Sequence, residues 1–264
     1  MDWHGLIRRI VTKILPEQAV LMLKKIYYRS YLEHLSESEP DLIVVKHLVR
    51  AGDCVIDIGA NVGTYTLALA RMVSPTGCVW SFEPIPETFS ILRSNVASFR
   101  LQNVKAFDVA LSSSDGSVIM EIPDWAGGGE NYYQSRIVGP SSTQAGLKRV
   151  VVTSKQLDEF FMDLAGKRLA FVKIDVEGHE FDVLRGAERV LQHHRPAMLV
   201  EASGNPDGSD GAVVSVFRLL VNMGYAPYWF DGNYLRARRE HDRSTNYFFL
   251  TAAQYDQYRR AGGN

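Results

Sequence analysis

The stretch Val55-Ile56-Asp57-Ile58-Gly59-Ala60-Asn61-Val62-Gly63 indicates the fold of this 264-residue chain most directly. Its first four residues form a short apolar run that ends at a glycine, which is typical of a parallel strand buried on both faces. A helical pattern follows from Thr64 to Ala70, so the glycines lie in a strand-to-helix turn. Such a turn presents backbone N–H groups to a ligand. The stretch therefore predicts a βα unit with a ligand site at its turn.

The same alternation continues along the chain. Further strands are predicted at residues 79–82, 104–109, 169–174 and 197–200, with helices at 88–99, 157–164, 181–191 and 213–223. Repeated βα units predict an α/β protein with a doubly wound parallel sheet. Strand-like runs at 225–230 and 247–251 would close this sheet at its edge and bring it to seven strands. We expect an N-terminal helical extension over residues 1–50 and the main domain over residues 51–255.

Three other segments stand apart from this alternation. A hairpin-like run at 116–122 precedes a glycine-rich stretch at 125–146, which we interpret as a structureless binding loop or lid. Residues 6–15 have an amphipathic pattern, with apolar positions interrupted by Arg8, Arg9 and Lys13. This pattern predicts a helix that packs on the domain, with binding to a membrane surface or to a partner as the alternative. The N-terminal helices are also a candidate surface for homo-oligomer formation.

Composition excludes several classes of protein. The chain has 29 basic and 30 acidic residues and a formal net charge of -1, so no global field attracts nucleic acid. No run of about 18 apolar residues is present, and we expect no transmembrane segment. Cys54 and Cys78 each lie in an apolar run, where buried free thiols in a reducing compartment are the simplest expectation. A cytoplasmic protein fits these features.

The glycine turn favours one nucleotide cofactor over another. A dinucleotide site needs G-x-G-x-x-G, and the middle glycine is replaced here by Asn61, whose side chain would occupy the pyrophosphate position. Asp57 suits a cationic ligand such as S-adenosylmethionine, and Glu83 can accept hydrogen bonds from two ribose hydroxyls before Pro84 turns the chain away. An NAD-dependent oxidoreductase and an inactive scaffold of the same fold remain as alternatives.

Three motifs together resemble the FkbM family of S-adenosylmethionine-dependent methyltransferases. They are residues 55–63, Phe82-Glu83-Pro84 and residues 171–180, which read FVKIDVEGHE, and the resemblance covers roughly residues 40–205. It implies a class I methyltransferase (Rossmann-like) fold and O-methylation of a hydroxyl on a small-molecule or glycan acceptor, such as a sugar or a polyketide-type natural product. The predicted cofactor contacts are Asp57, Gly59, Ala60, Asn61, Gly63, Thr66, Glu83, Pro84, Asp108, Val109 and Asp175.

The third motif also supplies candidates for the chemical step. Strand ends at the carboxyl edge of a doubly wound sheet face the ligand crevice, so Asp175, Glu177 and His179 are candidate general bases for an acceptor hydroxyl. The imidazole has the pKa closest to neutral pH, although a position in the first turn of a helix disfavours its charged form. Asp175 and Glu201 are alternatively candidate ligands of Mg²⁺, which could acidify a sugar diol. The sequence leaves the acceptor, and the choice between metal and general base, open.

Overall fold

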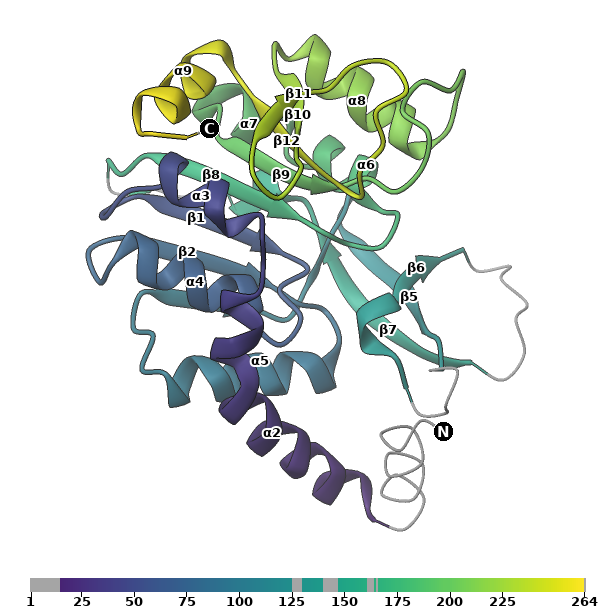
Figure 1. The fold of residues 1–264 in the computed structure, drawn as a ribbon. Coiled ribbons are helices and arrows are strands. Elements are labelled where there is room, and N and C mark those ends of the chain that lie inside the picture. The colour runs from purple at the N-terminus through teal and green to yellow at the C-terminus, as the bar shows by residue number, and fades with distance from the viewer. Residues whose placement is uncertain (1–14, 125–129, 140–146, 161–163, 165, 264) are drawn as a thin grey trace, which may run out of the picture.

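The computed structural model describes residues 15–124, 130–139, 147–160, 164 and 166–263 (Figure 1). Within these residues, the centre is an eight-stranded sheet in the order β11-β10-β12-β9-β8-β1-β2-β3. Its parallel strands are β1 (Cys54–Ile58), β2 (Cys78–Phe82), β3 (Val104–Phe107), β8 (Leu169–Ile174) and β9 (Ala197–Glu201). Strand β12 (Asn246–Leu250) is antiparallel to both β9 and β10 (Ala226–Phe230). The predicted doubly wound α/β architecture is confirmed.

Alternate residues of the central strands pack against helices on opposite faces of the sheet. Val55 and Phe171 contact one apolar core, which includes α3 (Leu42–Leu48), α4 (Thr64–Val73) and α9 (Ala252–Arg260). Their neighbours Ile56 and Val172 contact a second core with α6 (Glu180–Arg185), α7 (Glu188–His194) and α8 (Ala212–Asn222). Because both faces are covered, the strands read as continuous apolar runs.

A second sheet is inserted between β3 and β8 and lies to one side of the main sheet (Figure 1). It contains β4 (Ala110–Leu111), β5 (Gly116–Ile122), β6 (Arg136–Val138) and β7 (Lys148–Lys155), in the order β4-β7-β5-β6. The prediction of a structureless loop over 125–146 is therefore wrong for residues 136–138, which pair with β5. Residues 125–129 and 140–146 lie outside the described part of the chain.

Several predicted elements differ in detail. The main sheet has eight strands in the described residues rather than seven, because β11 (Leu235–Ala237) pairs with β10 inside a basic stretch that does not look strand-like. The helix predicted at 157–164 is described only as the short 3₁₀ turn Leu157–Phe160. The helix predicted at 181–191 is divided into α6 and α7 near Gly186, where a Cβ atom would lie 2.0 Å from the carbonyl oxygen of Ser112. Gly186 is the C-cap residue of α6, and the close approach of Ser112 leaves no room for a side chain there.

The two cysteines form a disulfide, so the expectation of free thiols is wrong. Cys54 and Cys78 are register partners on the adjacent strands β1 and β2, with their Cα atoms 4.6 Å apart. This separation lies within the range that a disulfide spans. The pairing follows from strand register, which the spacing of two cysteines in the sequence does not reveal.

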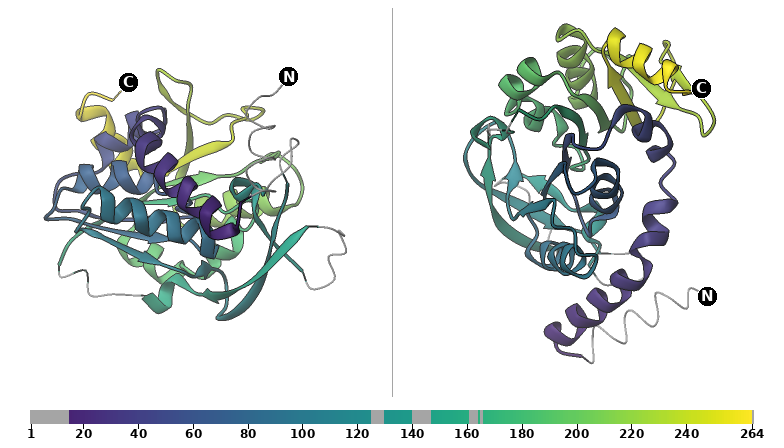
Figure 2. Two further views of the ribbon diagram at one scale, coloured as in Figure 1. Left: turned by 90° about the horizontal axis from the view of Figure 1, so that it is seen from below. Right: turned by 90° about the vertical axis from the view of Figure 1, so that its left-hand side faces the viewer.

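The chain before the main sheet forms α2 (Glu17–Glu37) and α3, joined by a short turn. Leu21, Tyr28 and Leu32 of α2 pack in a small core with residues of α4 and α5 (Pro86–Ser98). The N-terminal half of α2 extends past the edge of the main body (Figure 2). The helix predicted over residues 6–15 lies almost wholly outside the described residues. None of the described helices is both long enough and apolar enough to cross a membrane.

Candidate functional site

A cavity of about 330 Å³ opens at the carboxyl ends of β1, β2, β8 and β9. Its volume lies at the lower end of the range of small-molecule sites. The glycine turn after β1 and the segment after β2 form one wall, and Met120, Tyr132, Ser135 and Ile137 of the inserted sheet region form another. The strand ends of β8 and β9 close the cavity on the remaining side. This is the position at which doubly wound sheets bind ligands.

Gly59 joins the turn after β1 to the end of β8. Its φ is +73°, and a Cβ atom would lie 1.8 Å from the carbonyl oxygen of Asp175, so no other residue fits without movement of the backbone. The backbone N–H of Asp175 donates to the carbonyl oxygen of Ile58 at 3.2 Å. The glycine therefore makes room for the neighbouring chain, and Asp175 lies directly beside the turn.

Glu83 is a buried carboxylate held at the cavity wall by two backbone groups. One oxygen accepts from the N–H of Asn61 at 2.9 Å, and the other accepts from the N–H of Ile85 at 3.0 Å. Burial raises the pKa of Glu83 to about 7 despite these hydrogen bonds. A carboxylate offers about four lone-pair sites, so each oxygen retains acceptor capacity for a ligand hydroxyl. The geometry suits the ribose role predicted for this residue.

Lys173 is a buried cation that the sequence analysis did not select. Its ammonium group donates to the carbonyl oxygen of Gly59 at 2.9 Å and lies 3.0 Å from Asp175 Oδ2 and 3.8 Å from Asp57 Oδ1. Burial alone would lower the pKa of Lys173, but the two carboxylates outweigh it and raise the pKa. Lys173 thus connects the glycine turn with the end of β8. The sequence signal that could have selected Lys173 is its position in the Lys173-Ile174-Asp175 run of the third motif.

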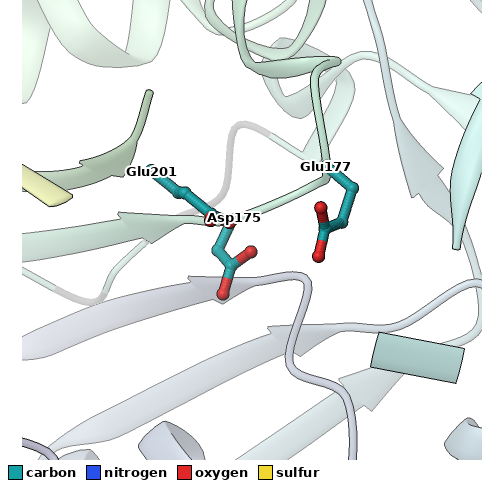
Figure 3. A group of neighbouring side chains, drawn as sticks. All are labelled: Asp175, Glu177 and Glu201. Carbon is teal, nitrogen blue, oxygen red and sulfur yellow. The ribbon is translucent and has the colours of Figure 1, made fainter. Parts of the chain in front are cut away.

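Three carboxylates converge where β8 and β9 end (Figure 3). Asp175, Glu177 and Glu201 each offer one oxygen within 4.8 Å of the others, and among the described residues they form the one group that could hold a metal ion. A hydrogen bond to Asp175, together with burial, raises the pKa of Glu201 to about 9. Burial would raise the pKa of Asp175, but the charge of Lys173 outweighs it and lowers the pKa. These opposite shifts favour a state at neutral pH in which the pair shares one proton, nearer to Glu201.

Glu177 differs from the other two acids. Its side chain is half-buried, and its pKa is raised by burial and by the nearby charges of Asp175 and Glu180. Its backbone adopts a left-handed φ of +53° directly before Gly178, which has a φ of +95°. The turn thus places a carboxylate of raised pKa in the cavity lining.

His179 is not brought together with these carboxylates. Its Nε2 atom lies 2.9 Å from the Ser112 hydroxyl, and its Nδ1 atom lies 3.5 Å from the Asp182 carboxylate. Burial lowers the pKa of His179. The residue occupies the N-cap position of α6, which begins at Glu180, without a capping hydrogen bond from its side chain. It is not one of the described residues that line the cavity.

The predicted cofactor residues fall into two groups. Those that line the cavity are Gly59, Ala60, Asn61, Glu83, Pro84, Val109 and Asp175. Those that do not are Asp57, Gly63, Thr66 and Asp108. The Asp57 carboxylate is fully buried beneath the turn and accepts from the Thr66 hydroxyl at 2.6 Å, so it supports the site from below. Gly63 is the N-cap residue of α4, and Asp108 is exposed.

Further lining residues come from distant parts of the chain. Glu39, from the turn between α2 and α3, accepts a hydrogen bond of 3.4 Å from the Tyr65 hydroxyl of α4. Asn246, at the start of β12, donates to the buried Asp41 carboxylate at 2.7 Å. Glu39, Tyr65 and Asn246 all line the cavity. No local motif marks them, because only the fold brings them to the site.

The parallel strands ordered β9-β8-β1-β2-β3, the antiparallel β12 between β9 and β10, and the cavity over the glycine turn define a class I methyltransferase fold. Residues 57–227 match the family model described as the methyltransferase FkbM domain, and the chain belongs to this family.

Curated relatives agree with this assignment. The chain is 31% identical over 145 residues to Methyltransferase 1 of Beauveria bassiana, covering 51% of this chain and 58% of the relative. It is 31% identical over 142 residues to the hexuronic acid methyltransferase AglP of Haloferax volcanii, covering 53% and 52%. It is 28% identical over 191 residues to the 31-O-demethyl-FK506 methyltransferase FkbM of Streptomyces tacrolimicus, covering 64% and 72%. The chain thus spans little more than half the length of the first two relatives.

Proposed function

We propose that this protein is an S-adenosylmethionine-dependent O-methyltransferase that acts on a hydroxyl of a sugar, a glycan or a polyketide-type natural product. Membership of the FkbM family supports the reaction class. The names of two relatives specify a hexuronic acid and an FK506 precursor, which fits a hydroxyl-bearing acceptor. The observation that carries the proposal is the buried Glu83 carboxylate, oriented at the cavity wall by the N–H groups of Asn61 and Ile85.

The residues of the cavity fit this cofactor. Asn61 Oδ1 is buried at the wall and has no hydrogen-bond partner among the described residues, so it offers an acceptor to an ammonium group. Glu83 would accept from the ribose hydroxyls, and Phe82, Pro84 and Val109 supply apolar contact for a base. When bound, the cofactor supplies a methyl group activated by a positively charged sulfur. The Asn61 side chain occupies the wall where a dinucleotide would need a glycine, which disfavours NAD.

Glu177 is the side chain we assign as general base. The pKa of Glu177 is raised and therefore lies closer to neutral pH than that of an ordinary glutamate. A base with such a pKa favours proton transfer from an acceptor hydroxyl. Asp175 is a weaker candidate because Lys173 holds its carboxylate at 3.0 Å and lowers its pKa. Its role would be to orient the acceptor, together with the protonated Glu201. We do not assign the base to His179, which hydrogen-bonds away from the cavity lining.

A Mg²⁺ ion at Asp175 and Glu201 stays a prediction. The acid cluster has the oxygen ligands that this ion prefers. However, Lys173 and the proton held by Glu201 already balance much of the cluster's negative charge. The three carboxylates can therefore lie close together without a metal ion. We therefore favour general base catalysis.

Calorimetric titration tests the cofactor assignment. We expect the protein to bind S-adenosylmethionine and S-adenosylhomocysteine, and to bind NAD much more weakly. Asp108→Asn is the control variant and should bind the cofactor like wild type, because Asp108 is exposed and does not line the cavity. Methyl transfer from isotopically labelled cofactor to a panel of sugars, glycans and polyketide alcohols would then identify the acceptor. Preferential binding of NAD would contradict the proposal.

A further inference from the structure

The outer face of α2 carries a row of exposed apolar side chains. They are between 38% and 64% exposed and comprise Met22, Leu23, Ile26, Tyr27 and Tyr31. Met22 and Ile26, Leu23 and Tyr27, and Tyr27 and Tyr31 are each four residues apart, so the five side chains lie along one side of the helix. The opposite side of α2 packs against α4 and α5 through Leu21, Tyr28 and Leu32. An exposed apolar row of this kind marks a contact surface rather than an ordinary solvated face.

Basic residues border this row on both sides. Between Glu17 and Glu33 the helix contains Lys24, Lys25 and Arg29 and no acidic residue. At 3.6 residues per turn, Lys24 lies at one border of the row, and Lys25 and Arg29 lie at the other. Apolar and aromatic residues flanked by cations are typical of helices that lie in the plane of a membrane interface. Tyrosine is also enriched at the interface between membrane and water.

We propose that the outer face of α2 binds the surface of an anionic lipid bilayer, with the apolar row in the interface and with Lys25 and Arg29 at the phosphate headgroups. Charge complementarity favours this occupant over a second copy of the chain. A two-fold contact between two such rows would bring the same basic borders together, and like charges at an interface are costly. The N-terminal half of α2 extends beyond the main body, so the helix can lie on a flat surface (Figures 1 and 2).

This surface lies beside the cavity without being part of it. Lys24 Nζ is 4.5 Å from the ring centroid of Tyr132, and Tyr132 lines the cavity wall formed by the inserted sheet region. The proposed contact therefore places the cavity wall next to the lipid headgroups. Its test measures vesicle binding and needs neither cofactor nor acceptor, so it is independent of the proposed enzymatic function.

Cosedimentation of the 264-residue chain with vesicles tests the inference. We expect binding to phosphatidylcholine vesicles that contain 30% phosphatidylglycerol, and much weaker binding to phosphatidylcholine alone or in 0.5 M salt. A basic residue near an anionic membrane strengthens partitioning about fivefold, so Lys25→Gln/Arg29→Gln should weaken binding about 25-fold. Leu23→Ser/Ile26→Ser should weaken it more than about tenfold, because buried methylene groups also drive partitioning.

Two control variants make the result specific. Val151→Ser/Val221→Ser removes apolar side chains that are exposed elsewhere and should bind like wild type. Ile7→Ser/Ile10→Ser should also retain binding. Thermal unfolding of each variant checks that the fold is intact. The inference is overturned if anionic vesicles are not bound, or if the Ile7/Ile10 pair alone abolishes binding. It is also overturned if the α2 substitutions only convert a dimer to a monomer in light scattering.

Discussion

Replacement of Glu83 by glutamine should weaken cofactor binding in a pH-dependent way. In the unliganded protein the Glu83 pKa is raised to about 7, while hydrogen bonds from two ribose hydroxyls would favour the charged carboxylate in the complex. Below pH 7, Glu83 must therefore lose a proton when the cofactor binds, and this lowers the affinity. From pH 8 to pH 6 the charged fraction falls from about ten elevenths to about one eleventh, so the affinity of wild type should fall about tenfold, or about 1.4 kcal/mol.

Glutamine cannot titrate and donates where the carboxylate accepts. At pH 8 the loss of charged acceptors should therefore weaken binding by about 1.5–3 kcal/mol, or at least tenfold. At pH 6 the difference from wild type should be about tenfold smaller than at pH 8, because only wild type loses about 1.4 kcal/mol of binding free energy over this range. Calorimetry with S-adenosylhomocysteine at pH 6, 7 and 8 measures both proteins, and titration of the ligand itself cancels in the comparison. Equal affinities at pH 8, or parallel pH profiles, would refute the assignment of Glu83 to the ribose.

Three further predictions concern catalysis and stability. Glu177→Gln should lower turnover about 10²- to 10⁴-fold with cofactor affinity within about twofold of wild type, whereas His179→Gln should retain most turnover; the reverse pattern in steady-state kinetics would assign the base to the histidine. Activity should persist in excess EDTA, and a loss that Mg²⁺ restores would show a metal at the carboxylate cluster. Thr66→Val removes the hydrogen bond to the buried Asp57 carboxylate and should lower the free energy of unfolding in urea by about 1.5–3 kcal/mol; unchanged stability would contradict that role.

The main sheet could be predicted because its signals are local. The run from Val55 to Gly63 contains both the strand pattern and the glycines that the turn requires. In the structure most of β1 lies in this run, which ends at the N-cap residue of α4. The same applies to β2, β8 and β9, whose apolar runs are buried on both faces. Asp175 and Glu201 follow from the same argument, because parallel strands end at one edge of the sheet.

The other features of the fold and the site depend on contacts between distant residues, which local sequence patterns do not reveal. Strand β6 is only three residues long and is defined by its pairing with β5, so residues 125–146 look like a loop. The Cys54–Cys78 disulfide depends on strand register. Glu39 reaches the cavity from the turn after α2, far from any motif. His179 lies in the most specific motif, yet its side chain hydrogen-bonds to Ser112 in the segment after β4.

The most direct test of the account is an experimental structure of the protein bound to S-adenosylhomocysteine. The account predicts the ribose hydroxyls at the Glu83 carboxylate, the amino group near Asn61, and the sulfur directed toward the Asp175, Glu177 and Glu201 cluster. A ligand bound elsewhere, or one whose sulfur is directed away from these carboxylates, would contradict both the cofactor site and the assignment of Glu177 as general base.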